Sequence, residues 1–212
     1  MIWSKEIRLY LGYALSQNGF IATINRDVAM YGKIYEENFS KIWSWITYYS
    51  PETISISDDG RYVIVSDGVW LYLFNKDGRL LWDKRLGDIF PEYGSVEVSF
   101  IPRSTSIAIL RGSYLGILSL NGTWILHPIK VDSADATHCA KRFAISKDYI
   151  FTFEDSNVYV YSMTNGKLLG KFSTGRERIN CITCSLDGNY VVVCSEDMWV
   201  YIFTKEIGSG NS

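Results

Sequence analysis

Two cysteines of this chain, Cys181 and Cys184, stand in a C-x-x-C pattern. This spacing is used by zinc sites and by redox-active thiol pairs. Residues 180–185, which contain it, are predicted to form a β-strand that precedes a Gly-containing turn. Residues three apart on a strand face opposite sides, so these two thiols point away from each other. The chain has no second C-x-x-C pattern, and the sequence therefore predicts no zinc or redox site here.

The hairpin that begins with this strand brings a different pair of cysteines close together. If Ser185 opposes Tyr190 across the intervening turn, then Cys181 opposes Cys194. Directly opposed residues on neighbouring strands have Cβ atoms close enough for a disulfide. Free thiols are the rule in the cytosol, however. We expect Cys181 and Cys194 to be reduced, with a Cys181–Cys194 disulfide as the alternative.

Four aspartates recur at the same kind of tight turn, and a ring of acids would be able to hold a metal or a cationic ligand. The alternative is that each carboxylate accepts hydrogen bonds from nearby backbone N–H groups and stabilises its own turn. The equal spacing and similar local sequence favour the alternative. We therefore predict structural turn acids and no metal site. These acids are Asp27, Asp67, Asp155 and Asp197.

The remaining candidates for catalysis are weak. His127 and His138 are the only histidines, and neither accompanies a nucleophile motif. The carboxylate pair of a glycosidase would have to project from the innermost strands. Those strands carry a single acid, Glu97. The sequence also lacks a glycine-rich phosphate loop, so it predicts a protein that is not an enzyme and needs no cofactor.

Composition restricts the class of protein. Hydrophobic residues make up 47% of the chain and aromatic residues 15%, as expected for a folded core. The 21 basic and 23 acidic residues nearly balance, so nonspecific nucleic-acid binding is unlikely. No apolar run has the length of a membrane span, and the first residues do not resemble a signal peptide. We expect a cytoplasmic protein that does not bind a membrane.

The stretch 52–87 organises the chain, because it contains four short strands separated by tight turns. We name these strands a to d in chain order. The same pattern recurs about every forty residues, which is the period of a β-propeller blade. The last residues of the five a strands are Ser16, Ser57, Ile101, Ser146 and Ser185. The predicted blades cover residues 10–46, 52–87, 94–131, 139–174 and 178–206.

The last blade lacks a strand d before the chain ends. Residues 1–7 resemble the other d strands, and Trp3 aligns with Trp43 and Trp82. We therefore expect an all-β, five-bladed propeller of four-stranded antiparallel blades, in which residues 1–7 complete the last blade. It would be a monomeric single domain over residues 1–207, with a flexible tail at 208–212. The alternatives are a fragment of a larger propeller and a ring closed by dimerisation.

At this point the chain resembles the WD-repeat β-propeller family. The resemblance rests on the S-x-D-G turns at 57–60 and 185–188, on the acids between strands b and c, and on the G-[KR]-L-L segments at 78–81 and 166–169. The Trp-Asp pair that ends strand c in the family is missing, and so is its Gly-His pair. Trp82-Asp83 lies in strand d instead. The resemblance implies a rigid binding platform.

In such a blade the d–a and b–c loops share one face, and here these loops are the longer and more varied ones. Aromatic and arginine side chains dominate binding hot spots. We therefore expect a partner protein to bind this face; the alternative is that the aromatic residues only cover the blade ends. A carbohydrate-binding five-bladed lectin is a second interpretation, and a propeller-type hydrolase a third. The partner-binding candidates are Tyr48, Tyr49, Phe90, Tyr93, Tyr114, His138, Arg176 and Arg178.

Overall fold

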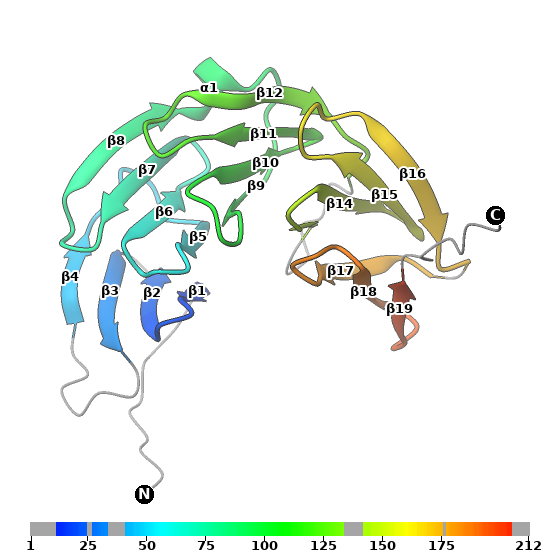
Figure 1. The fold of residues 1–212 in the computed structure, drawn as a ribbon. Helices are drawn as coiled ribbons and strands as arrows, with labels where there is room; N and C mark the ends of the chain where they lie inside the picture. Colours follow the sequence, from blue (N-terminus) through cyan, green and yellow to red (C-terminus); the bar gives the residue numbers. More distant parts are fainter. Residues whose placement is uncertain (1–11, 25–26, 34–40, 134–141, 176, 205–212) are drawn as a thin grey trace, which may run out of the picture. The chain divides into compact units, whose positions relative to one another are not determined.

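The structure is a computed structural model that describes all residues except 1–11, 25–26, 34–40, 134–141, 176 and 205–212. The described chain is built from antiparallel strands that form five sheets, with one short helix, α1 (Leu86–Ile89). Figure 1 shows the strands of each sheet lying side by side in chain order. No helix in the described ranges is both long and apolar enough to cross a membrane.

Each sheet is a meander in which neighbours along the chain are neighbours in the sheet. The first two sheets contain β1 (Gly12–Leu15), β2 (Phe20–Ile24), β3 (Val28–Lys33) and β4 (Lys41–Trp45), then β5 (Thr53–Ile56), β6 (Tyr62–Ser66), β7 (Trp70–Asn75) and β8 (Leu80–Arg85). The third contains β9 (Val96–Phe100), β10 (Ile107–Arg111), β11 (Tyr114–Leu118) and β12 (Trp124–Lys130). The fourth contains β13 (Phe143–Ile145), β14 (Tyr149–Glu154), β15 (Asn157–Ser162) and β16 (Leu168–Ser173), and the fifth β17 (Ile179–Cys184), β18 (Tyr190–Ser195) and β19 (Val200–Thr204).

The five sheets fall within the five predicted blades, and they are consistent with a five-bladed propeller. Four of the sheets have four strands, and the last has three among the described residues. The strand predicted at residues 1–7, which would complete that sheet, lies outside the described residues, as does the predicted tail at 208–212. Closure of the ring therefore stays a prediction.

The a–b turns show why this sequence folds into hairpins. In the second blade the Ser57 hydroxyl donates to Asp59 Oδ1 at 2.7 Å, and the Gly60 N–H donates to the Ser57 carbonyl at 2.8 Å. Gly60 has a φ of +69°, a conformation that costs glycine little. The turn that begins at Ser185 repeats these bonds, with Ser185 donating to Asp187 Oδ1 at 2.5 Å. The S-x-D-G motif thus fixes the hairpin register.

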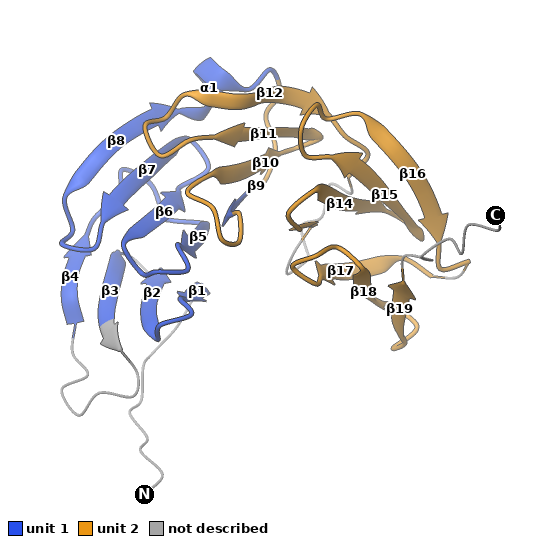
Figure 2. Ribbon diagram, in the orientation of Figure 1, with its two compact units in different colours: residues 1–91, 96–100 blue, residues 92–95, 101–212 orange. Residues whose placement is uncertain are grey.

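The chain divides into two compact units, residues 1–91 with 96–100, and residues 92–95 with 101–212 (Figure 2). In unit 1, apolar residues of β2, β3, β5, β6 and β7 form one core, in which Met30, Val63 and Phe74 are fully buried. Its strands b and c are apolar on both faces, as expected for a sheet that is covered on both sides.

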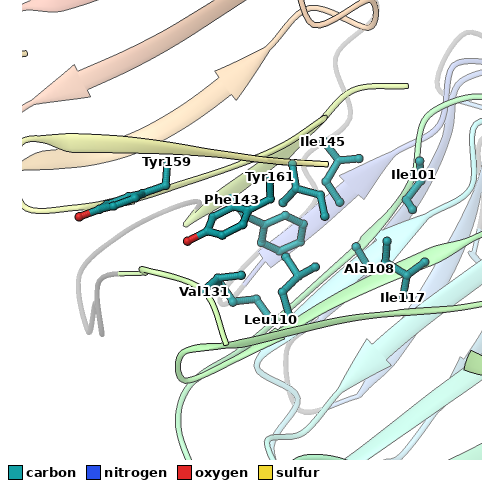
Figure 3. Packing of buried hydrophobic residues seen from close by; sticks show 11 residues of the cluster. Ile101, Ala108, Leu110, Ile117, Val131, Phe143, Ile145, Tyr159 and Tyr161 are labelled. Atoms are coloured by element: carbon teal, nitrogen blue, oxygen red, sulfur yellow. The ribbon is translucent and has the colours of Figure 1, made fainter. Parts of the chain in front are cut away.

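Unit 2 contains two further apolar clusters. In the first, Phe143 and Tyr161 from the fourth sheet point toward Leu110 of the third sheet and Val131, which follows β12 (Figure 3). The second cluster joins the fourth and fifth sheets through residues such as Phe153 and Val193. The buried strands thus form a rigid support for the loops at their ends, and binding residues are usually found on such loops.

Candidate binding site

The best-ordered site on the d–a/b–c side is built around Asp67 in unit 1. This carboxylate is 3% exposed and lies in the turn between β6 and β7. Its Oδ1 accepts the backbone N–H groups of Val69 at 3.1 Å and Trp70 at 2.7 Å. Its Oδ2 accepts the Tyr72 hydroxyl at 2.8 Å and the backbone N–H of Tyr49 at 3.2 Å. One buried acid therefore holds both the b–c turn and the d–a loop.

The d–a loop is fixed at further points. The Thr47 hydroxyl donates to the Tyr49 carbonyl at 2.5 Å, and the Glu52 N–H donates to the Ser66 carbonyl at 2.8 Å. Burial raises the pKa of Tyr72 above its usual range, and the hydrogen bond to Asp67 adds to the effect. The phenol therefore stays protonated and keeps donating to Asp67 at neutral pH.

Upon this support, Tyr48 and Tyr49 lie at the surface with 78% and 57% of their side chains exposed. Together with Trp70 and Asp83 they line a hollow of about 370 Å³. The rings of Tyr48 and Trp70 have centroids 6.2 Å apart and planes inclined by 46°. Two of the predicted binding residues are thus brought together with an indole and a carboxylate that the sequence analysis did not select.

Phe90 was predicted to contact a partner, and the structure corrects this. Its side chain is only 5% exposed, and its backbone N–H closes helix α1 by donating to the Leu86 carbonyl at 2.9 Å. The ring is buried, so it offers almost no surface to a partner.

Tyr93, in unit 2, is 87% exposed. Its ring lies 5.0 Å from the guanidinium carbon of Arg111, which is 3% exposed. Nε and Nη1 of Arg111 have no hydrogen-bond partner in the described part of the chain, and burial lowers the pKa of this group. The aromatic face of Tyr93 therefore supplies the favourable contact that this buried cation does have.

The other predicted binding residues do not gather around one hollow in the described part of the chain. Tyr114 begins β11 and is half-buried. Arg178 is exposed, and its Nε lies 3.6 Å from Asp155 Oδ1. His138 and Arg176 lie outside the described residues.

The remaining turn acids differ in their contacts. Asp197 accepts the N–H of Trp199 at 3.1 Å and the hydroxyl of Tyr201 at 2.7 Å, which repeats part of the Asp67 arrangement. Asp155 has a φ of +50° and pairs with Arg178. Asp27 is half-buried and makes no comparable contact with the described residues.

The cysteine pair is opposed across β17 and β18, with Cys181 opposite Cys194. The Cys181–Cys194 disulfide therefore stays an alternative to the expected reduced pair. No group of three metal-ligating side chains occurs among the residues that the structure describes.

A larger hollow, of about 780 Å³, lies in unit 2 at the a–b and c–d turns, away from the loops predicted to bind a partner. Its lining includes Pro102, Ile125, Met163 and Asp187. The Asp187 carboxylate already accepts bonds from Ser185 and Asn189, which hold its pKa below the usual range. This hollow is larger but less specific, because its acid is engaged in its own turn.

No family model matches the chain, and no curated protein matches it in sequence. In contrast, 1411 chains of solved structures match its fold. One of them is the Cps50 (Swd1) beta-propeller domain from Myceliophteria thermophila, with a TM-score of 0.70 and 12% sequence identity. The match covers 94% of this chain and 66% of that domain. The chain has a WD40-like β-propeller fold.

Trp70 and Asp83 are the site residues that sequence analysis missed. Trp70 lies in strand c of the stretch 52–87 and Asp83 in its strand d, outside the loops that were predicted to bind. Counting from the β7–β8 turn would not have found them, because the register shifts between Leu73 and Phe74. Tyr72 pairs with Asp83 across β7 and β8, so alternation places Trp70 and Asp83 on the same face of the sheet.

Proposed function

We propose that this chain is a non-enzymatic interaction module that binds a partner protein through its d–a and b–c loops. The observation that carries the proposal is the pair Tyr48 and Tyr49, which are largely exposed on a loop that the buried Asp67 holds in place. Exposed aromatic side chains on a preformed loop bind with little ordering cost. The WD40-like fold supports the same conclusion, since such propellers usually bind proteins.

Affinity capture with the full chain and mass spectrometry tests the proposal. A partner captured by the wild type is expected to be lost by the double variant Tyr48→Ala/Tyr49→Ala. The matched control is Lys76→Ala/Arg79→Ala, which removes two exposed side chains at the c–d turn of the same sheet. Both variants should keep the thermal unfolding midpoint of the wild type, because none of the four side chains is buried.

A partner retained equally by all three proteins would contradict the choice of face. A chain that captures no protein but binds immobilised glycans through Tyr48 and Tyr49 would replace the proposal with the lectin interpretation.

A further inference from the structure

The hollow beside Asp67 has a chemistry of its own. Three of the four residues that line it are aromatic, and the fourth, Asp83, is an exposed carboxylate. The Asp83 carboxylate makes no ion pair or hydrogen bond within the described residues. Aromatic faces carry negative potential and attract cations, and a nearby carboxylate adds to that attraction.

A second acid lies at the same end of the sheet. The Glu52 carboxylate lies against Gly68 in the b–c turn, where a Cβ on Gly68 would approach Glu52 Oε1 to 2.7 Å. Glu52 therefore contributes negative charge at the same end of the sheet. The hollow thus has aromatic walls and one carboxylate in its lining, that of Asp83.

A cation of the chain itself does not fill the hollow. Arg85 pairs with Trp70 across β7 and β8 and is exposed, but it makes no ring contact or ion pair within the described part of the chain. Its neighbour Lys84 instead lies over Trp82, with Nζ 5.9 Å from the ring centroid. The strand thus already places one cation on an indole, while the Trp70 site stays without one.

We propose that the hollow formed by Tyr48, Tyr49, Trp70 and Asp83 binds a cationic side chain of the partner: a lysine, an N-methylated lysine or an arginine. This inference rests on the proposed function and specifies which partner chemistry the face recognises. The cation lies against the tilted rings of Tyr48 and Trp70, and the Asp83 carboxylate contributes charge at the rim. Because Asp67 fixes the Tyr49 backbone and the start of β7, the walls are in place before the partner arrives.

An NMR titration of the ¹⁵N-labelled full chain tests this inference directly. The probes are four short Gly/Ser peptides that differ only at one central residue: lysine, trimethyllysine, arginine or the neutral norleucine. At least one cationic peptide is expected to shift the Trp70 indole N–H resonance and to bind about tenfold more tightly than the norleucine peptide. The cationic peptide that binds most tightly identifies which cationic side chain the site prefers.

Two variants separate electrostatic from apolar contributions. Tyr48→Leu keeps an apolar wall but removes the aromatic face, and Asp83→Asn removes the charge while keeping the shape. Each is expected to weaken binding of the cationic peptide about three- to tenfold. Asp77→Asn makes the same charge change at the far end of the sheet, in the β7–β8 turn, and should leave affinity unchanged.

The inference is overturned if the norleucine peptide binds as tightly as the cationic ones, if no peptide binds, or if Asp83→Asn and Tyr48→Leu both behave like Asp77→Asn. The two proposals fail separately. A captured protein that depends on Tyr48 and Tyr49 while no cationic peptide binds would leave the proposed function standing. Cationic peptides that bind while no protein is captured would support the inference and count against the proposed function.

Discussion

At the scale of single residues, a tyrosine–aspartate hydrogen bond recurs at the blade ends. Tyr72 donates to Asp67, and Tyr161 donates to Asp132 in the loop that precedes its own sheet, both at 2.8 Å. Tyr201 donates to Asp197 at 2.7 Å. This chain lacks the Gly-His and Trp-Asp pairs of the WD-repeat family, and these tyrosines supply a different bond between strand c and the adjoining loop or turn.

The Tyr161 pair predicts a loss of stability at high pH. Burial is the main cause that raises the pKa of Tyr161 to about 12; the N–H of Asp132, which donates to the hydroxyl, lowers it, and the hydrogen bond to the Asp132 carboxylate raises it. An unfolded tyrosine has a pKa of about 10. The stabilisation is therefore complete below about pH 10 and is lost as the pH rises toward 12, because the unfolded chain releases its proton first.

We expect Tyr161→Phe to lose less stability than the wild type between about pH 9 and about pH 11. Urea unfolding at the two pH values measures the difference, with Tyr190→Phe as the control, since Tyr190 is 53% exposed. Equal losses for wild type and Tyr161→Phe would show that the pair does not stabilise the folded chain.

At the scale of elements, Asp67 links the loop after β4 to the turn between β6 and β7. Asp67→Ala would leave the N–H groups of Trp70 and Tyr49 and the buried Tyr72 hydroxyl without their acceptor. We expect a loss of about 2–4 kcal/mol in the free energy of unfolding, since unsatisfied buried polar groups are costly. The exposed Asp83→Asn should change it by less than about 0.5 kcal/mol.

A double-mutant cycle with Tyr72→Phe sharpens this prediction. If the hydroxyl and the carboxylate act together, the double variant loses less stability than the two single variants combined. Additive losses, or a loss for Asp67→Ala no larger than for Asp83→Asn, would contradict the central role of Asp67.

The elements were predictable where short-range chemistry sets them. The Ser57 and Ser185 turns indicate where hairpins begin, and strand alternation places Cys181 opposite Cys194. The prediction that Phe90 contacts a partner was wrong, because an aromatic side chain on a loop can face inward. Nothing in the local sequence pattern indicates helix α1. The Tyr48–Trp70 contact was missed because it joins a loop to a strand beyond the next hairpin, a distance that local periodicity does not describe.

At the scale of the whole molecule, each unit has one terminal sheet with an uncovered apolar face. In unit 1, Tyr13 and Leu15 of β1 are 65% and 53% exposed. In unit 2, Val200 and Ile202 of β19 are 58% and 65% exposed. β19 is also an edge strand among the described residues, and an unpaired edge can pair with another strand.

The prediction that residues 1–7 pair with β19 follows from the same need, since a paired edge is no longer open to other chains. Hydrogen exchange of the full chain and of a variant lacking residues 1–7 tests it. Deleting these residues should speed exchange of the outward-facing amides of β19 by about tenfold or more, whereas the central strand β7 should exchange as before. Fast exchange of β19 in both proteins would contradict pairing by residues 1–7. Protection that appears only at high protein concentration would instead indicate closure by a second copy of the chain, because only that contact depends on concentration.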